Sequence, residues 1–282
     1  MMPWFPELFS ASVLDRIRRD AADTRAAEPV PYFAGLRSGE TEALVGSFAG
    51  EPELHHPVRG RVKGLHAFER FVQDSNSWLT ERGAVFGPVE RIIQRRRGVE
   101  ETVMTVDTDR GRVEVPVAVA ADRDDDGRII ELRIYWSMWP ITGQHAHRPP
   151  LLEPDPELTE SDVVGEYQRA LAAGDAEAVL ATFEPDAYVR EPAGSAYVHR
   201  GHDELRALYE RFFSNGGGIQ LEHCTVTDDG RACALEYNVV RWGRTELTPS
   251  ETGLAVYVRG ASGKLASARM YDDADPPIRS EG

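Results

Sequence analysis

The sequence has few cysteines and no long apolar run. Its 282 residues include two cysteines, Cys224 and Cys233, which are too few for a disulfide framework and lack zinc-site spacing. We expect both to be small core residues. The first two dozen residues carry acids and arginines where a secretory signal needs an uninterrupted apolar stretch, and no stretch approaches the ~20 apolar residues of a membrane span. The sequence therefore predicts a cytoplasmic protein.

Positive charge is also scarce. Lysines and arginines number 32 against 47 aspartates and glutamates, and the formal net charge is −15. The phosphates of nucleic acids attract basic protein faces, and so do anionic membrane surfaces. We therefore expect neither nucleic acid nor membrane as a partner. Hydrophobic residues still make up 41% of the chain, which is enough to build folded cores.

One segment occurs twice. The stretch "YQRALAAGDAEAVLATFEPDAYVREP" at 167–192 has the counterpart "YFAGLRSGETEALVGSFAGEPELHHP" at 32–57. Tyrosine, glycine, phenylalanine and proline landmarks all repeat at the same offset, and nearer the end of each copy Arg133 and Tyr135 match Arg269 and Tyr271. Because this unit is too long for a solenoid repeat, the pattern predicts two whole domains in tandem.

A proline-rich stretch separates the two copies. The prolines in "GQHAHRPPLLEPDPELTES" forbid a continuous helix there, and the apolar spacing before residue 28 favours an extra helix. We expect an N-terminal helical extension over 1–28, a first domain over 29–148, a linker over 149–159, a second domain over 160–275 and a tail over 276–282.

The apolar period changes along each copy. In the second copy, apolar residues recur at helical spacing up to Gly174, which is placed to end a helix, and Asp175 is placed to cap the next one. Two alternating runs then flank an Asp-Gly turn in "IQLEHCTVTDDGRACALEYNVVRW", which indicates a β-hairpin. Helices followed by a curved antiparallel sheet make an α+β domain, a cone whose open end can hold a small molecule.

The segment "EYQRALAAGDAEAVLATFEPDAYVREP" resembles the opening of the ketosteroid isomerase family and of the related SnoaL-like polyketide cyclases, within the wider NTF2-like fold. The resemblance covers residues 29–140 and 160–274. It implies two cone-shaped domains, paired sheet against sheet about a pseudo-twofold axis, with a further homodimer left open. It is a poor guide to activity, because this fold hosts isomerases, cyclases, epoxide hydrolases and pure binding modules.

The resemblance also implies site residues in the second copy. Tyr167 matches the oxyanion-binding tyrosine of the isomerase, and Glu191 matches its general-base aspartate. The isomerase's second oxyanion donor, an aspartic acid, has no counterpart in "GLAVYV". Glu222 in "IQLEHC" resembles instead the second acid of epoxide hydrolase–cyclases, where one carboxyl protonates the epoxide and the other activates a hydroxyl. A one-residue shift in strand register would turn Glu222 outward.

The first copy keeps the tyrosine, as Tyr32, but has His56 where the second has Glu191. Histidine can act as a general base near neutral pH. Its neighbour His55 points to the other face of an extended strand, so the two cannot easily share a metal ion, and no metal or cofactor is expected. Glu90 is the rough counterpart of Glu222.

Three hypotheses follow. The favoured one is a cofactor-independent enzyme that acts on a hydrophobic small molecule by acid/base catalysis, as an isomerase, a polyketide cyclase or an epoxide-opening hydrolase-cyclase. The second is a non-catalytic module that binds a similar ligand as a sensor or carrier. The third is a structural pairing domain with a filled cone. Tyr167, Glu191, Glu222, His56 and Tyr32 are the candidate catalytic residues.

Overall fold

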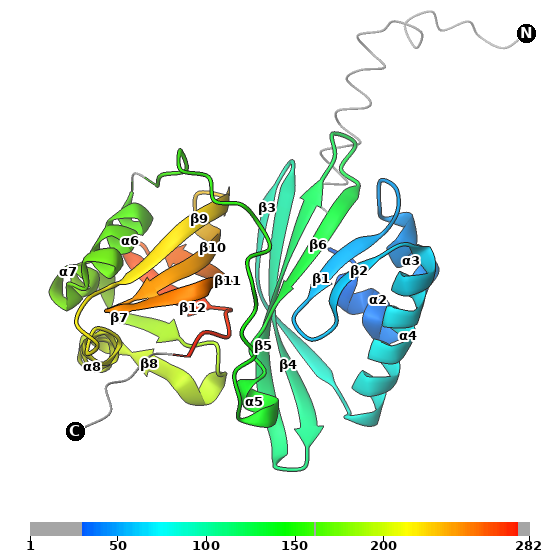
Figure 1. Cartoon of the computed structure of the whole chain (residues 1–282), viewed down its shortest axis with the longest axis horizontal. Coiled ribbons are helices and arrows are strands. Elements are labelled where there is room, and N and C mark those ends of the chain that lie inside the picture. Colours follow the sequence, from blue (N-terminus) through cyan, green and yellow to red (C-terminus); the bar gives the residue numbers. More distant parts are fainter. Residues whose placement is uncertain (1–29, 161, 276–282) are drawn as a thin grey trace, which may run out of the picture.

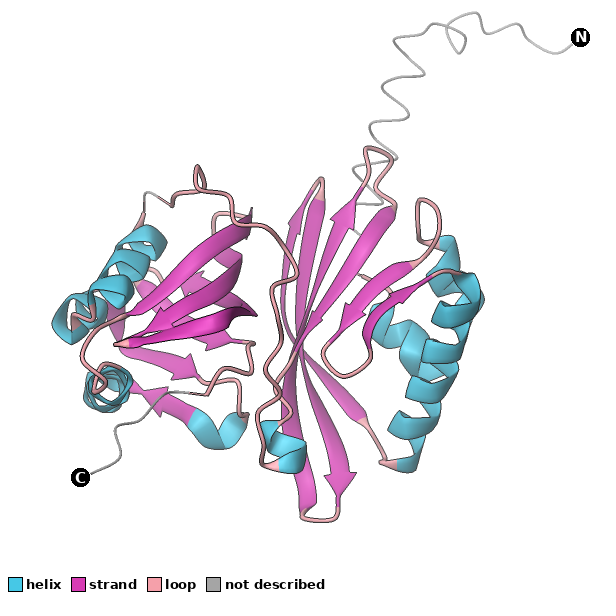
Figure 2. Cartoon of the chain, in the orientation of Figure 1, coloured by secondary structure: helices cyan, strands magenta, loops and turns pink. Residues whose placement is uncertain are grey.

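The protein is described here by a computed structural model that covers residues 30–160 and 162–275 (Figure 1). The expected N-terminal helix and the tail lie outside these residues. The described chain forms two halves, each a six-stranded sheet with its helices, apart from the short helix at Trp139–Thr142, on the face turned away from the other half (Figure 2). The predicted α+β class and the pairing of two cone-shaped halves, sheet against sheet, are confirmed.

The first half contains four helices and six strands among the described residues. Its helices are α2 (Tyr32–Ser38), α3 (Thr41–Gly46), α4 (Leu65–Glu81) and α5 (Trp139–Thr142). Its strands are β1 (Glu53–His56), β2 (Gly60–Lys63), β3 (Val85–Gln94), β4 (Arg97–Thr108), β5 (Gly111–Arg123) and β6 (Ile129–Tyr135).

The second half repeats this plan. Its helices are α6 (Val163–Ala173), α7 (Ala176–Ala181) and α8 (Gly201–Phe212), with a 3₁₀ turn, η2, at Ser195–Tyr197. Its strands are β7 (Phe183–Arg190), β8 (Val198–Arg200), β9 (Ile219–Asp228), β10 (Ala232–Trp242), β11 (Thr245–Arg259) and β12 (Leu265–Met270).

The two sheets have the same strand order. The order is β2-β1-β6-β5-β4-β3 in the first half and β8-β7-β12-β11-β10-β9 in the second. The expected hairpin of β9 and β10 is present. Neither sheet is purely antiparallel, because β1 pairs parallel to β6 and β7 pairs parallel to β12. The sequence analysis missed these two pairs, which join the first strand of each half to its last across the intervening helix and hairpins.

Local sequence signals explain how the helices of the second half begin and end. Asp162 accepts a hydrogen bond from Val164 N at 2.9 Å and caps α6, and Asp175 accepts one from Ala178 N at 3.0 Å and caps α7. Gly174 ends α6 in the left-handed region at φ +71°, and a Cβ there would lie 2.6 Å from Gly218 N. The predicted roles of Gly174 and Asp175 are confirmed.

Each half has its own core between its helices and the inner face of its sheet. A third cluster lies between the two sheets and is made largely of small or β-branched side chains, which let the sheets approach closely. Its fully buried members include Ile92, Val99, Ala118, Ala120, Ala232, Leu254 and Val256. Cys224 and Cys233 are buried free thiols, as expected.

Two reciprocal ion pairs cross this interface. Arg133 of β6 donates to Glu236 of β10 from Nε at 2.6 Å and from a terminal nitrogen at 2.8 Å, and Tyr135 donates to the same carboxylate at 2.8 Å. All three side chains are almost fully buried. The repeated arginines, Arg133 and Arg269, lie on the outer faces of their sheets, each paired with a glutamate. Those outer faces are the interface.

The second pair repeats the first with the halves exchanged. Arg269 of β12 donates to Glu101 of β4 at 2.8 and 2.5 Å, and Tyr271 donates to Glu101 at 2.5 Å. Burial alone would raise the pKa of Glu236, but Arg133, Thr225 and Tyr135 hold it at about 2. The halves are therefore joined by two bidentate pairs in a dry setting, where an unpaired charge is costly.

Removing one charge of such a pair leaves the other buried and alone. We expect Glu236→Gln to lower the free energy of unfolding at pH 7 by about 3–5 kcal/mol, measured by urea denaturation. Because the folded pKa of Glu236 is lowered from 4.5, its stabilisation is present above about pH 4.5 and is lost as the pH falls toward 2. The difference between variant and wild type should therefore shrink in acid. The exposed Glu222→Gln is the control and should change stability by less than about 0.5 kcal/mol.

Candidate functional site

Each half encloses a cavity between its helices and the inner face of its sheet. The cavity of the second half, called the second cavity, has a volume of about 250 Å³. Tyrosines and apolar side chains of α6, α8 and β9–β12 form most of its wall: Tyr167, Leu171, Phe212, Ile219, Leu221, Tyr237, Val239, Trp242, Tyr257 and Met270. Its ionisable side chains are Glu191, Arg211, Asp272, Asp275, His145 and Tyr197, besides the tyrosines of the wall.

Asp272 is a half-buried carboxyl group in this wall. It follows β12 and accepts a hydrogen bond from the Tyr237 hydroxyl at 2.7 Å. Burial raises the pKa of Asp272 from 3.8 to about 6, with Asp273 and Glu251 adding to the effect and the Tyr237 hydroxyl opposing it. A carboxyl that titrates near neutral pH and faces a cavity is suited to take up and return protons.

A glycine makes room for this pair. Gly253 of β11 lies opposite Tyr237 in the sheet, and a Cβ on it would lie 2.6 Å from the Tyr237 ring and 2.9 Å from the Asp272 side chain. Any larger residue would push the phenol and the carboxyl apart. The sequence analysis did not find Asp272 or Tyr237. Strand parity was the available signal, because outward Arg269 and Tyr271 require Asp272 to face inward.

Glu191 also lines the second cavity, as the resemblance implied. It follows β7, and its side chain is 13% exposed. One carboxylate oxygen is 2.6 Å from His199 Nε2 and accepts a hydrogen bond from Arg211 at 2.9 Å. Both contacts hold this oxygen of the carboxyl group in place at the cavity. The cavity therefore brings together two carboxyl groups in different settings, one beside a guanidinium and one in a tyrosine-lined wall.

Tyr167 borders the same cavity but is fully buried. Its hydroxyl oxygen lies 2.9 Å from that of Tyr209, and either can donate. Burial, Tyr209 and Asp272 hold the pKa of Tyr167 well above its ordinary range. Tyr197 is the more accessible phenol, 36% exposed. Because the Trp139 indole donates to the Tyr197 oxygen at 3.2 Å, the Tyr197 proton is left for another acceptor.

Glu222 does not line the second cavity together with Glu191. It is exposed and does not line the cavity, whereas its neighbour Leu221 does. Glu222 lies opposite Asn238 of β10, and the Asn238 amide donates to Leu152 O on the outer face of the sheet. The expected placement of Glu222 in the pocket is therefore wrong, since the strand register turns it outward. Glu90 likewise lies outside both cavities and pairs with Arg231 across the interface.

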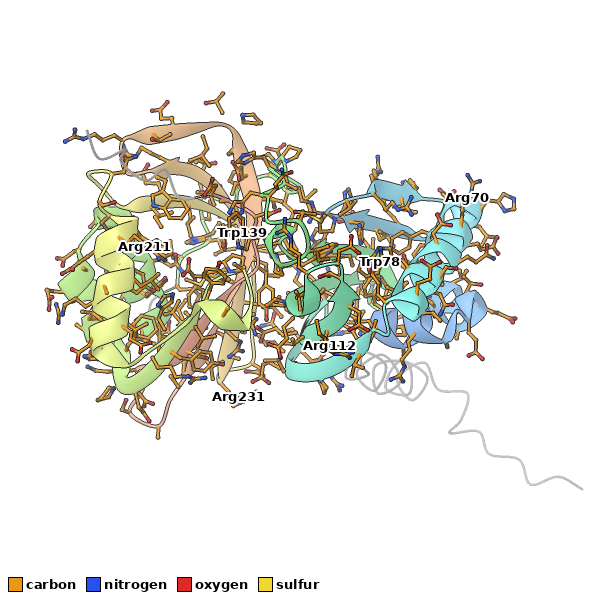
Figure 3. The ribbon with its side chains drawn as sticks, turned by 90° about the horizontal axis from the view of Figure 1, so that it is seen from below. Arg70, Trp78, Arg112, Trp139, Arg211 and Arg231 are labelled. Atoms are coloured by element: carbon orange, nitrogen blue, oxygen red, sulfur yellow. The ribbon has the colours of Figure 1, made fainter. Side chains whose placement is uncertain are left out.

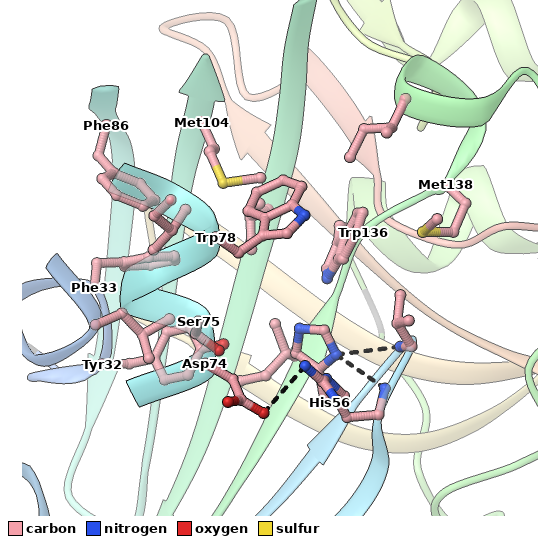
Figure 4. A pocket seen from close by; sticks show the side chains of 17 residues that line it. Tyr32, Phe33, His56, Asp74, Ser75, Trp78, Phe86, Met104, Trp136 and Met138 are labelled. Atoms are coloured by element: carbon pink, nitrogen blue, oxygen red, sulfur yellow. Dashed lines mark hydrogen bonds and ion pairs between the residues drawn. The ribbon is translucent and has the colours of Figure 1, made fainter. Parts of the chain in front are cut away.

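The first cavity, in the first half, has a volume of about 310 Å³ and a mostly aromatic and aliphatic wall (Figure 4). Tyr32 and His56 both line it. Burial raises the pKa of the Tyr32 hydroxyl. Burial, with Arg148 and Arg59 nearby, lowers the pKa of His56 to about 3, so the imidazole is neutral at pH 7. His55 points to the other side of the strand, between Glu53 and Glu131.

Two groups of side chains among the described residues could hold a metal ion by proximity. They are Glu53, His55 and Glu131, and Glu160, Asp228 and Cys233. Both are already engaged by cations of the protein, since Arg61 and Lys63 contact Glu53 and Arg259 contacts Asp228. No described helix is long and apolar enough to cross a membrane.

Residues 164–268 match the family model of the SnoaL-like domain. The second half is therefore identified as a SnoaL-like domain, and both halves are NTF2-like in fold. A comparison with curated proteins found no match.

Among solved structures, the chain is similar to the epoxide hydrolase/cyclase-like enzyme SalBIII, described in pyran ring formation in the polyether salinomycin, at 14% identity. The match covers 45% of this chain and 95% of that one, with a TM-score of 0.33. A putative polyketide cyclase from Sinorhizobium meliloti matches at 21% identity over 38% and 92% of the two chains, with a TM-score of 0.32. An NTF2-like protein of unknown function from Cytophaga hutchinsonii matches at 15% identity over 42% and 95%, with a TM-score of 0.33. These values carry no argument about activity.

The raised pKa of Asp272 implies that this residue affects the free energy of unfolding in a pH-dependent way. A carboxyl whose folded pKa is raised contributes stability below its unfolded value of 3.8, and that contribution is lost as the pH rises through about 6. Asparagine keeps the acceptor for Tyr237 without the charge. We therefore expect Asp272→Asn to stabilise the fold at pH 8 by about 2–3 kcal/mol and to be near neutral at pH 3.

Urea unfolding at both pH values measures this, with the exposed Asp186→Asn as the matched control. A destabilisation by Asp272→Asn that is the same at both pH values would contradict the assignment.

Proposed function

We propose that the second cavity is the active site of a cofactor-independent enzyme, in which Asp272 and Glu191 carry out acid/base catalysis on an uncharged hydrophobic small molecule. The observation that carries this is Asp272, a carboxyl group that has a pKa near 6, accepts a hydrogen bond from Tyr237 and lines a tyrosine-rich cavity. The SnoaL-like match over residues 164–268 supports a reaction class among isomerisation, cyclisation and epoxide opening.

Each carboxyl group has a role that its surroundings favour. Asp272 takes a proton when ionised and gives one when protonated, and a pKa near the working pH serves both directions. Glu191, which accepts a hydrogen bond from Arg211, is the second carboxyl group and is placed to activate a hydroxyl or water. Two carboxyl groups in one cavity can serve as an acid and a base when their environments push their pKa values apart. The pair proposed here is thus Glu191 with Asp272 in place of Glu191 with Glu222.

The remaining polar groups position the substrate. Tyr237 holds the Asp272 carboxyl group in one orientation. Tyr197, whose oxygen already accepts from Trp139, can donate its proton to a substrate oxygen at the cavity mouth. Tyr167, fully buried and bonded to Tyr209, supports the wall from behind. The apolar remainder of the wall excludes charged substrates, because a charge buried there would lose its hydration.

Proton transfer can be tested without knowing the substrate. We expect the protein to accelerate α-proton exchange of 2-tetralone, an uncharged enolisable ketone, in D₂O above the buffer rate. The rate should rise with pH through about 6 as Asp272 becomes the carboxylate base. Asp272→Asn should lower it by about 10²- to 10⁴-fold, followed by proton NMR.

Styrene oxide tests whether Asp272 can also donate a proton. Its opening needs Asp272 as the acid, so that rate should fall as the pH rises through 6. Glu191→Gln should slow epoxide opening, while Glu222→Gln, on the outer face, should match wild type for both substrates. Rates equal to buffer for both compounds, or an Asp272→Asn variant as active as wild type, would refute catalysis at this cavity.

A specific observation favours a second role for the first half, namely ligand binding without catalysis. Asp74 is the single carboxyl group among the described residues that line the first cavity, and Arg59 contacts it at 3.3 Å. That cavity therefore lacks the acid/base pair of its counterpart.

A further inference from the structure

The two cavities differ at the positions that carry the chemistry. At the offset of the repeat, His56 stands where the second half has Glu191, and Trp136 stands where it has Asp272. Both replacements line the first cavity. The first cavity thus has a neutral imidazole and an indole at the two positions where the second cavity has carboxyl groups.

His56 presents one defined polar group to that space. Its Nδ1 accepts the backbone N–H groups of Val58 and Arg59, both at 3.2 Å, so the proton of the neutral ring is on Nε2 (Figure 4). Among the described residues Nε2 has no hydrogen-bond partner. The ring is held edge-on by Phe71 and Trp136, with centroids 5.3 and 5.7 Å away. The cavity therefore offers a fixed imidazole N–H donor in a largely aromatic wall, which suits an uncharged ligand with an acceptor oxygen.

One short segment belongs to both cavities. Residues 136–146, called the shared segment, include α5 and run along the junction of the halves, where Trp139 lies (Figure 3). Trp136, Met138 and Ile141 line the first cavity, while Trp139 and His145 line the second. A ligand that moves the first set of side chains therefore acts on the backbone that carries the second set.

Asp273 fixes the shared segment to the chain beside Asp272. It accepts hydrogen bonds from the Ser137 hydroxyl, from Met138 N at 3.1 Å and from Ala146 N at 2.7 Å. Its other contact on the segment is His145 Nδ1 at 3.1 Å. The path from one cavity to the other is short: Trp136 is followed by Ser137, which bonds Asp273, which follows Asp272.

We propose that the first cavity is an effector site for an uncharged, largely apolar ligand whose acceptor oxygen bonds His56 Nε2, and that its occupancy reaches the second cavity through Ser137 and Asp273. A coupling of this kind is reciprocal, so a ligand in either cavity changes the affinity of the other by the same factor. The proposal concerns binding and does not depend on catalysis at Asp272.

Prodan, an uncharged naphthyl ketone whose emission moves to shorter wavelength away from water, is the probe. We expect it to bind the full chain. His56→Phe should weaken binding about 3- to 10-fold, the worth of one hydrogen bond. Ser75→Trp places an indole in the first cavity from a half-buried position on α4 and should abolish binding there. Circular dichroism and urea unfolding check that both variants fold.

The indole N–H resonances report the coupling. On saturation with prodan, the Trp139 resonance should shift while that of Trp242 stays in place. Both residues line the second cavity, but only Trp139 is on the shared segment. Ser137→Ala should keep the prodan affinity and reduce the Trp139 shift.

Absence of prodan binding, an unmoved Trp139 resonance, or an undiminished shift in Ser137→Ala would overturn the proposal. Joint shifts of Trp139 and Trp242 that persist in Ser75→Trp would also overturn it, because they would show prodan in the second cavity. None of these readouts uses turnover, so their failure is separate from failure of the enzyme hypothesis.

Discussion

The arrangement of this protein depends on two buried arginine–glutamate pairs that join one half to the other. Arg133 with Glu236 and Arg269 with Glu101 cross a close contact between the sheets, where both members of each pair are buried. Charges so buried are stable only when both partners are present. The pairs therefore fix which faces of the sheets meet, and the opposite faces, which most of the helices cover (Figure 1), are those that line the cavities.

The same constraint positions the candidate site. In the extended chain at the end of β12, Tyr271 points to the interface and bonds Glu101, Asp272 points into the second cavity and bonds Tyr237, and Asp273 points back toward the first half. Three consecutive residues thus join the halves, supply the proposed acid/base group and hold the shared segment. In the first half the equivalent triplet is Tyr135, Trp136 and Ser137, so an indole replaces the cavity-facing carboxyl group and a serine replaces Asp273.

Much of the fold was predictable because its signals are local. The repeat, the caps of α6 and α7 and the hairpin of β9 and β10 follow from residue spacing and turn chemistry. The placement of Glu222 was not, because a strand's facing depends on its register. The bulge between β9 and β10, where His223 and Thr225 oppose successive residues, disturbs simple alternation beside it. Asp272 lies outside the motif at 166–192 on which the resemblance was argued, so strand parity with Arg269 and Tyr271 was the remaining signal for it.

The central claim is that Asp272 is a carboxyl group that exchanges its proton near neutral pH inside the second cavity. Its direct test is a ¹³C NMR titration of the Asp272 carboxyl carbon in the full chain, assigned by loss of the resonance in Asp272→Asn. The account predicts a midpoint near pH 6, set by burial beside Asp273 and Glu251. A midpoint near 4, the value of an ordinary solvated aspartate, would contradict it and remove the basis for acid/base catalysis at this position.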